Sequence, residues 1–505
     1  MNNYGTVYLI GAGPGDPGLL TIRAKELIKS ADVIVYDYLA NEEFLDYARE
    51  DAKFEYVGKK GGDHTRTQDQ INALIIEHAR SGKSVARLKG GDPYVFGRGG
   101  EEAQELVAAG VPFEVVPGIT AGVAAAAYAG IPVTHRDFTP SVAFITGHED
   151  PNKEESAHHW EAYAQSTSTL VFYMGVKNLP MIAEKLIEAG RPADEPAAII
   201  RWGTRCNQRS HVSTLKKLPG EAEKLGFAAP SIIVVGGVCG LKSKLKWFEE
   251  RPLLGKGVVV TRAREQASDL AVKLRDLGAC VIQFPTIAIQ ELSDYSEVES
   301  EILSLQSWDW VVFTSVNGVK HFFRQLGEIG LDARVFGGLD VAAIGPATAD
   351  ALRERGINPD FVPEKYVAEH VVEGLLEKGV KGKRVLIPRA KVAREVLPEE
   401  LARAGAEVKI LPVYETALAE ANADKLEKKL ADGEVHYVTF TSSSTVENFF
   451  TLLAPEVLKR YEGTVKLAAI GPVTAKTLEG FGFTADIQPE DYTIPGLVDA
   501  LVGNR

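Results

Sequence analysis

This chain has few cysteines and no long apolar runs, and its 56 lysines and arginines are outnumbered by 69 acidic residues. Its 505 residues include only three cysteines, Cys206, Cys239 and Cys280, which show neither metal-ligand spacing nor an even-numbered disulfide framework. We therefore expect them to be buried structural thiols in a reducing cytoplasm. The ten histidines form no ligand motif either, so no metal is predicted.

The remaining bulk properties indicate a soluble globular protein. No apolar run approaches the ~18 residues of a membrane span, and the small-residue stretch 118–133 fits a packed helix better. The net charge of −13 argues against binding to nucleic acid or to an anionic membrane surface. The amino-terminal residues lead directly into a predicted strand, so no signal peptide is expected. The length and the 45% apolar, 25% charged composition fit about three or four cytoplasmic domains.

The most informative stretch is residues 85–100 (VARLKGGDPYVFGRGG), where an apolar strand stops at two glycines and an aspartate. Adjacent glycines let a ligand approach the main chain, because no Cβ blocks it. Asp92, at the carboxyl end of a strand, can accept hydrogen bonds from a ligand. The alternative is an ordinary turn between strand and helix.

A second glycine-rich turn, residues 11–18 (GAGPGDPG), follows a predicted strand at 6–10 and precedes a predicted helix at 19–30. It is similar to a Rossmann opening, but Asp16 replaces the third glycine of the motif, and Pro14 lacks the amide that a phosphate would want. A dinucleotide site is therefore not predicted here. The alternative interpretation is a pocket lined by backbone for a neutral or zwitterionic ligand.

Two charged residues follow further strands. Asp37 ends the predicted strand 31–36, where a carboxylate can serve as a general base or merely cap a helix. Lys59 lies in the loop 58–62 (GKKGG) after the predicted strand 54–57. Downstream, residues 115–122 (VVPGITAG) place proline and glycine before a small-residue helix, so that a ligand can approach the free amides of the helix start.

These pieces belong to one ordered set of motifs: GAGPGDP, VIVYD, VGKK, RLKGGDP, VPGIT, THR, TGH, YMG and WGT. The set resembles a uroporphyrinogen-III C-methyltransferase from Asn3 to about Leu245. The resemblance implies a homodimer of two-lobed α/β subunits, each binding S-adenosylmethionine between its lobes. It makes Asp37 the proton acceptor and Lys59 the proton donor. The donor-binding positions it implies are Pro14, Gly90, Gly91, Asp92, Val95, Thr120, Ala121, Met174 and Gly203.

The implied chemistry suits these residue types. Methyl transfer from a sulfonium requires the pyrrole carbon in line with the methyl group, and the resulting ring cation loses a proton that a carboxylate can accept. The substrate carries many carboxylates, so local cations must offset the acidic net charge. The available cations are Lys59, Lys60, Arg66, Arg87, Lys89, Arg98, His135, Arg136, Arg201 and Arg205. Of these we select Arg87, Arg98 and Arg136 as substrate-binding candidates.

The second half of the chain repeats itself at an offset of 126 or 127 residues. Residues 310–315 (WVVFTS) recur as 437–442 (YVTFTS), and 343–349 (AIGPATA) recur as 469–475 (AIGPVTA). Alternating short strands and amphipathic helices predict parallel sheets covered on both faces. The turns that contain Thr314, Ser315, Thr441 and Ser442 would then lie at the carboxyl ends of strands, where ligands bind. Alternatively, these hydroxyls only cap helices.

From about Gly255 this half resembles uroporphyrinogen-III synthase, which cyclises hydroxymethylbilane with inversion of the last pyrrole ring. The resemblance implies that one lobe contains residues 255–288 with 415–505 and the other residues 289–414, joined by a two-stranded linker. It places Tyr414, in 411–416 (LPVYET), in the cleft as a candidate catalytic residue. It also places Thr348, Ser442 and Thr474 at cleft positions.

The sequence thus predicts an α/β chain of two two-lobed halves. Residues 1–245 form the methyltransferase half, with lobes of about 1–116 and 117–245; residues 246–254 are a linker and 255–505 the synthase half. We expect a bifunctional enzyme that makes uroporphyrinogen III and methylates it at C2 and C7 to precorrin-2. The alternatives are a methyltransferase for a later corrin intermediate, and a second half that binds tetrapyrroles without catalysis.

Overall fold

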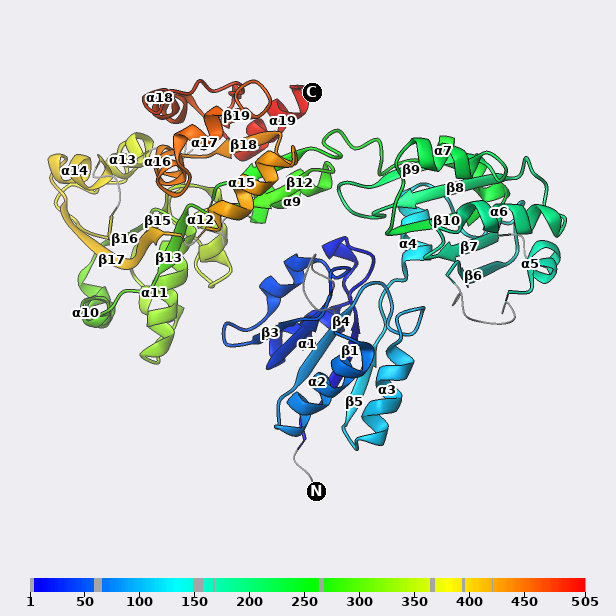
Figure 1. Cartoon of the computed structure of the whole chain (residues 1–505). Coiled ribbons are helices and arrows are strands. Elements are labelled where there is room, and N and C mark those ends of the chain that lie inside the picture. The colour runs from blue at the N-terminus through cyan, green and yellow to red at the C-terminus, as the bar shows by residue number, and fades with distance from the viewer. Residues whose placement is uncertain are drawn as a thin grey trace. The chain divides into compact units, whose positions relative to one another are not determined.

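The computed structural model describes residues 4–58, 66–148, 158–166, 169–262, 268–363, 368–392, 396–419 and 421–504. The chain divides into two compact units. Figure 1 shows the helices and strands coloured in chain order from the N-terminus to the C-terminus. The first unit is Met1–Gly257 with Lys273–Cys280, and the second is Val258–Val272 with Val281–Asn504. Among the described residues, no helix combines the length and the apolar character needed to cross a membrane.

The first sheet of the first unit is wholly parallel, with strand order β3-β2-β4-β1-β5. The four strands predicted at 6–10, 31–36, 54–57 and 85–89 are confirmed to within two residues at each end. The bounds are β1 Val7–Gly11, β2 Val33–Tyr36, β3 Lys53–Tyr56, β4 Val85–Lys89 and β5 Phe113–Val116.

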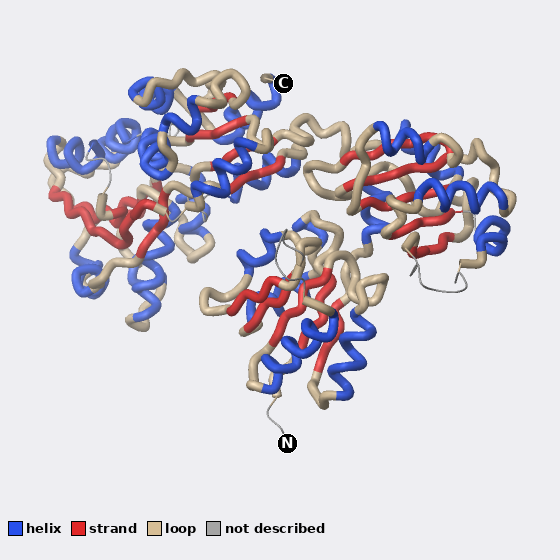
Figure 2. Tube along the Cα trace, viewed as in Figure 1, coloured by secondary structure: helices blue, strands red, loops and turns tan. Residues whose placement is uncertain are grey.

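Both faces of this sheet are covered, because successive side chains of a strand point to opposite faces. Val85 packs in one core with residues of the helices α2 (Gln68–Arg80) and α3 (Gly99–Ala108). Ala86 and Leu88 pack in the other core, with residues of α1 (Ile22–Ser30). The same alternation puts Arg87 and Lys89 on the Val85 face, toward α2 and α3. Figure 2 shows helices alongside the strands of this sheet.

Local capping sets the helix starts. A helix was expected over 19–30, but α1 begins at Ile22 because the Thr21 side chain accepts from the Ala24 amide. The preceding residues form a separate 3-10 turn, η1 (Pro17–Leu19), capped by Asp16. The helix α2 starts at a full capping box between Thr67 and Gln70.

The second sheet of the first unit has strand order β6-β7-β10-β8-β9. Only β6 and β7 pair in parallel, and the other neighbours are antiparallel. The strands are β6 Val142–Thr146, β7 Thr169–Tyr173, β8 Pro196–Arg201, β9 Arg209–Thr214 and β10 Ser231–Val235. The remaining elements of this unit are η2 Glu42–Tyr47, α4 Ala121–Tyr128, α5 Trp160–Ser166, α6 Leu179–Glu188, α7 Leu218–Lys224, η3 Gly237–Leu241 and α8 Lys242–Leu245.

The expectation for the cysteines was wrong for two of the three. Cys206 and Cys280, both in the first unit, form a disulfide with a Cα–Cα distance of 5.1 Å. They are 74 residues apart in sequence, and sequence spacing does not show which cysteines become neighbours in the fold. Cys239 is a free, buried thiol, as expected.

The second unit contains two further sheets. One has the order β12-β11-β18-β19, with parallel pairing between β11 and β18 and between β18 and β19. The other has the order β13-β17-β16-β14-β15 and is parallel except for the pairing of β13 with β17. Its long strand β17 therefore pairs in parallel with β16 on one side and antiparallel with β13 on the other. The strands are β11 Gly257–Val260, β12 Cys280–Gln283, β13 Ile287–Gln290, β14 Trp310–Phe313, β15 Asp340–Ala343, β16 Arg384–Ala390, β17 Glu407–Leu418, β18 Tyr437–Phe440 and β19 Lys466–Ala469. The first residues of β11 and β12, Gly257 and Cys280, are the ends of segments that belong to the first unit.

Each sheet of the second unit draws on strands that are far apart in sequence. The β12-β11-β18-β19 sheet joins residues 257–283 to residues 437–469, so it does not correspond to either sequence repeat alone. The helices of this unit are α10 Ser296–Leu303, η4 Leu305–Ser307, α11 Val316–Glu328, η5 Ala333–Phe336, α12 Pro346–Arg353, α13 Ala368–Glu377, α14 Val396–Arg403, α15 Ala423–Ala431, α16 Ser443–Leu452, α17 Pro455–Lys459, α18 Pro472–Gly480 and α19 Ile494–Gly503. The boundary between the units falls within α9 Ser268–Asp276, between Val272 and Lys273.

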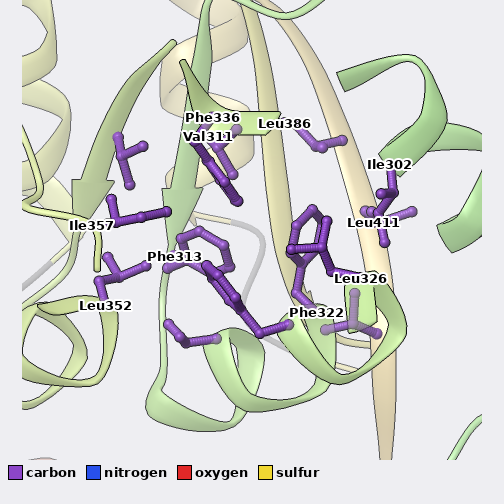
Figure 3. Close-up of a cluster of buried hydrophobic side chains, with 14 of the residues drawn as sticks. Ile302, Val311, Phe313, Phe322, Leu326, Phe336, Leu352, Ile357, Leu386 and Leu411 are labelled. Atoms are coloured by element: carbon purple, nitrogen blue, oxygen red, sulfur yellow. The ribbon is translucent and has the colours of Figure 1, made fainter. Parts of the chain in front are cut away.

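An aromatic core holds α11 against the β13-β17-β16-β14-β15 sheet (Figure 3). Phe313 of β14 and Phe322 of α11 are fully buried, with ring centroids 5.6 Å apart and planes at 83°. Phe336 completes the group at 5.8 Å from Phe322. Edge-to-face pairs of this kind stabilise beyond the area they bury.

Phe322→Ala should therefore lower the opening free energy of this sheet by about 3–5 kcal/mol, because it leaves a cavity in a closed core. Hydrogen exchange of the β14 and β15 peptides is the measurement. Leu303→Ala, at a residue 73% exposed on α10, is the control and should change protection by less than about 0.5 kcal/mol. Equal effects of the two substitutions would contradict this assignment of the core.

Candidate functional site

A large cavity of about 1240 Å³ opens in the first unit. Residues from both of its sheets line the cavity, including residues that follow β1, β2, β4, β7 and β8. Eight of the nine predicted donor-binding residues are among them. These eight are Pro14, Gly90, Gly91, Val95, Thr120, Ala121, Met174 and Gly203.

Two glycine-rich turns build one wall by pairing with each other. Gly13 and Gly91 exchange both of their backbone hydrogen bonds, at 3.1 and 2.7 Å. Both have φ near +70°, a conformation that glycine adopts without strain. A Cβ on Gly118 would collide with the Gly91 carbonyl. Main chain from three loops therefore meets here without intervening side chains.

Asp92, the ninth predicted donor-binding residue, does not line the cavity. Its Oδ2 accepts from the Gly118 amide at 3.0 Å and its Oδ1 accepts from the Tyr94 amide at 2.8 Å. Both carboxylate oxygens are thus used to hold two loops together. In this arrangement Asp92 supports the glycine wall.

Tyr173, at the end of β7, organises the start of α4. Its hydroxyl accepts from the Gly122 amide at 2.8 Å and shares a 2.7 Å hydrogen bond with Thr120. Burial raises the pKa of Tyr173, so the phenol stays protonated at neutral pH. The sequence motif YMG pointed to this strand end but did not reveal that its tyrosine caps a helix elsewhere in the chain.

Left-handed backbone clusters around the same cavity. In the described part of the chain the non-glycine residues with positive φ are Phe96, Arg98, Met174, Trp202 and Thr204. All except Thr204 line the cavity. Each such conformation costs on the order of 1–3 kcal/mol and persists only where the surrounding structure holds it. This concentration of strain is typical of a ligand site.

Asp37, the predicted proton acceptor, lies at the cavity with its side chain 26% exposed. Its Oδ1 accepts from the Leu39 amide at 3.0 Å. Its Oδ2 accepts from both terminal nitrogens of Arg87, at 3.3 and 3.4 Å. The carboxylate is therefore oriented by two neighbours. Lys59, the predicted proton donor, lies outside the described residues.

Of the three cations selected as substrate-binding candidates, Arg87 and Arg98 line the cavity and the exposed Arg136 does not. The cavity also contains Lys89 and Arg205, which belonged to the wider set of cations. Lys177 and His148 were missed as basic side chains. The only available signal was their position: Lys177 lies two residues after the YMG motif, and His148 is the last residue of the TGH motif.

In the second unit, the two repeated Phe-Thr-Ser turns both start helices. Ser315 accepts from the Gly318 amide at 3.0 Å, and Ser442 accepts from the Thr445 amide at 3.3 Å. The hydroxyls of both serines therefore cap helices. The preceding Thr314 and Thr441 are half-buried. Thr348 and Thr474, in the first turns of α12 and α18, are each 4% exposed.

Tyr414 occupies a polar cluster at the carboxyl end of β14. Its hydroxyl lies 3.2 Å from Ser315 Oγ, and the His321 ring stacks on it at 5.3 Å between centroids. Burial raises the pKa of Tyr414, an effect that the bond to Ser315 partly offsets. Sequence reasoning missed His321 and also Arg389, which is 4% exposed at the end of β16. His321 lies outside the repeated segments, whereas Arg389 lies in residues 385–390 (VLIPRA), which repeat residues 258–263 (VVVTRA).

Comparison with known proteins finds a different family in each half of the chain. Residues 6–219 match the family model described as tetrapyrrole (corrin/porphyrin) methylases, and residues 268–499 match that of uroporphyrinogen-III synthase HemD. The porphyrin biosynthesis protein HemD of Ruminiclostridium josui is 39% identical over 499 residues, which cover 99% of this chain and 98% of that protein.

Two further similarities concern the first half alone. The S-adenosyl-L-methionine-dependent uroporphyrinogen III methyltransferase of Methanosarcina barkeri is 55% identical over 239 residues, 47% of this chain and 94% of that protein. The crystal structure of the uroporphyrin-III C-methyl transferase of Thermus thermophilus, solved with S-adenosyl homocysteine, has 38% identity and a TM-score of 0.41, covering 47% of this chain and all of that one.

The family models each match one half, and the Ruminiclostridium relative matches across both. The two halves also have the α/β sheets expected of them. The chain therefore belongs to the family of tetrapyrrole biosynthesis proteins that join a tetrapyrrole methylase to a uroporphyrinogen-III synthase in one polypeptide.

Proposed function

We propose that this enzyme cyclises hydroxymethylbilane to uroporphyrinogen III and then methylates that product at C2 and C7 with S-adenosylmethionine, giving precorrin-2. The observation that carries this proposal is the fusion itself. The product of a uroporphyrinogen-III synthase is the substrate of a uroporphyrinogen-III methyltransferase, so two consecutive steps share one chain.

The size and the walls of the cavity support methyl transfer. A volume of about 1240 Å³ exceeds the ~300–1,000 Å³ usual for one small ligand, and methyl transfer needs a donor and an acceptor side by side. The backbone wall around Gly90 and Gly91 suits a zwitterionic donor such as S-adenosylmethionine, because amides and carbonyls are both presented there. The name of the 55% identical Methanosarcina relative states the same donor.

We assign the proton-accepting step to Asp37, which lines the cavity. Attack of a pyrrole carbon on the sulfonium methyl forms a carbon–carbon bond, releases S-adenosylhomocysteine and leaves a cationic ring. Loss of a ring proton to the Asp37 carboxylate then restores a neutral ring system. We retain Lys59 as the proposed proton donor on the strength of the family motif alone.

Basic side chains around the cavity offset the acidic charge of the whole chain. A substrate with many carboxylates is repelled by a protein of net charge −13 unless cations gather locally. The cations that line the cavity are Arg87, Lys89, Arg98, Lys177 and Arg205. Because Arg98 pairs with exposed Glu101, a substrate carboxylate can compete for it.

For the synthase reaction we propose Tyr414 as the residue that assists loss of hydroxide from hydroxymethylbilane. Departure of hydroxide leaves a cationic azafulvene, and a phenol that stays protonated can donate a hydrogen bond to the leaving oxygen. The raised pKa of Tyr414 keeps its proton in place through neutral pH. Ser315 orients the hydroxyl at 3.2 Å.

The whole reaction sequence can be tested in two stages with the purified full chain. Incubated with hydroxymethylbilane alone, it should form uroporphyrinogen III, and after S-adenosylmethionine is added a doubly methylated product should appear by mass spectrometry. Heat-inactivated protein is the control, because hydroxymethylbilane closes spontaneously. If the product is only the type I isomer, the second half has no synthase activity, and the alternative that it binds tetrapyrroles without catalysis is favoured.

Asp37→Asn should reduce the methylation rate roughly 10²–10⁴-fold, the usual contribution of a general base, with binding of S-adenosylhomocysteine unchanged by calorimetry. Asp51→Asn is the control, since that carboxylate is 71% exposed and pairs with nearby Arg49. A full methylation rate for the Asp37 variant would show that another group accepts the proton.

Tyr414→Phe should slow formation of uroporphyrinogen III about tenfold or more, because the ring still packs but the donated hydrogen bond is lost. Methylation of supplied uroporphyrinogen III should not change. Tyr437→Phe is the matched control, since Tyr437 is 4% exposed and bonds a backbone carbonyl through its hydroxyl. Equal cyclisation rates for both variants would exclude Tyr414 from the reaction.

A further inference from the structure

A cluster of buried charges lies behind Asp37. Arg87 and Lys89 of β4 and Glu102 of α3 have side chains only 4%, 5% and 1% exposed. Lys89 Nζ donates to Glu102 Oε1 at 2.7 Å, and Arg87 Nε donates to the same oxygen at 3.4 Å. The other edge of the Arg87 guanidinium faces Asp37. Two cations and two carboxylates thus balance in one place.

Glu102 is the element that joins this cluster. Its Oε1 accepts from three side chains, the third being Gln68 Nε2 of α2 at 3.1 Å. Its Oε2 is buried and has no hydrogen-bond partner among the described residues. A buried carboxylate with one unsatisfied oxygen is unfavourable by itself. Glu102 is therefore stabilised in this position by its two cationic partners, Arg87 and Lys89.

Strand geometry explains why these groups meet. Val35 of β2 is in register with Arg87, and period-two alternation puts Asp37 on the face that carries Arg87 and Lys89. That face is covered by α2 and α3, which supply Gln68 and Glu102. The Arg87 guanidinium is planar with donors on two edges, so it is clamped between the carboxylates of Glu102 and Asp37.

We propose that Glu102 is a positioning residue of methyl transfer, which holds Arg87 so that Arg87 orients the Asp37 carboxylate toward the cavity. Glu102 does not line the cavity itself and acts through Arg87. The inference rests on the proton-accepting role proposed above for Asp37. Lys89 completes the arrangement, because its charge balances Glu102 and stops that carboxylate from drawing Arg87 away from Asp37.

The protonation of Lys89 gives this arrangement a pH dependence. Burial, with repulsion from Arg87, lowers the pKa of Lys89 to about 8, while Glu102 opposes that shift. The charged groups that face Lys89 are Arg87 on its own strand, Glu102 and Glu101 on α3, and Asp37 after β2. Below this pKa the cluster is balanced. Above it Lys89 is neutral, Glu102 competes for Arg87, and the methylation rate should fall.

Glu102→Gln in the full chain tests the proposal. We expect kcat for methylation to fall roughly tenfold to a hundredfold, as for a misplaced reacting group, with the affinity for S-adenosylhomocysteine within about twofold of the original. Without the Glu102 charge no carboxylate is left to draw Arg87 away from Asp37 when Lys89 loses its proton, so the alkaline fall in rate should disappear. Loss of a carboxylate with a purely structural role would leave that fall in place.

The matched control is Glu195→Gln. Glu195 is also buried and paired with an arginine, Arg191, at 3.3 Å, with side chains 13% and 8% exposed. Neither residue lines the cavity. This variant should lower thermal stability but leave kcat and the pH profile of methylation unchanged.

Two further variants keep the outcome decisive. If the glutamine variant does not fold, Glu102→Asp retains the charge but draws the oxygen back from Arg87, and kcat should fall while S-adenosylhomocysteine still binds. Combining Lys89→Met with Glu102→Gln restores charge balance without the clamp, so its kcat should stay low. Recovery of kcat in this double variant, or an unchanged kcat and pH profile in the single ones, would overturn the role of Glu102. A full rate for Asp37→Asn would instead overturn the proposed function on which it rests.

Discussion

Parallel strand pairing is the constraint on which this structure depends. Parallel neighbours must all run in one direction, so every loop that follows a strand emerges at the same edge of the sheet. In the first sheet this brings together the turn after β1, Asp37 after β2 and the glycines after β4. Residues that are up to 80 positions apart in sequence thereby form one wall, with Gly13 and Gly91 bonded backbone to backbone. The same constraint gathers the Phe-Thr-Ser turns at strand ends in the second unit.

At this edge of the sheet, the residues that line the cavity include energetically unfavourable features, namely strained backbone and buried charge. Four non-glycine residues with left-handed backbone line the cavity, and behind it lie buried charges that are unfavourable unless they are paired. Arg87 links the two features, since it lines the cavity and also belongs to the buried cluster. Rigid packing on both sheet faces supplies the stability that such a site requires. In the second unit the aromatic core around Phe322 has the equivalent role for α11 and the neighbouring Tyr414.

Much of the site could be predicted, because glycine and proline turns after apolar strands have only a few uses. The structure places Pro14, Gly90 and Thr120 at the cavity as the motifs indicated. Asp92 was predicted to line the site but does not, because its carboxylate accepts hydrogen bonds from the amides of two loops. That contact depends on how the two loops meet in the fold. Arg136 was selected only for its charge, and it lies on the exposed surface away from the cavity. The hydroxyls of the repeated turns were ambiguous from sequence, and two of them serve as helix caps.

The sequence by itself determined the fold class, the two families and four of the five strands of the first sheet, because strand periodicity and glycine-rich turns are local properties of the chain. Tertiary structure alone decided which side chains meet. The register of β2 on β4 sets Asp37 beside Arg87, the packing of α3 brings Glu102 under Lys89, and the fold rather than the spacing joins Cys206 to Cys280. These contacts depend on register and helix placement, which arise from packing over the whole sheet and cannot be read from neighbouring residues.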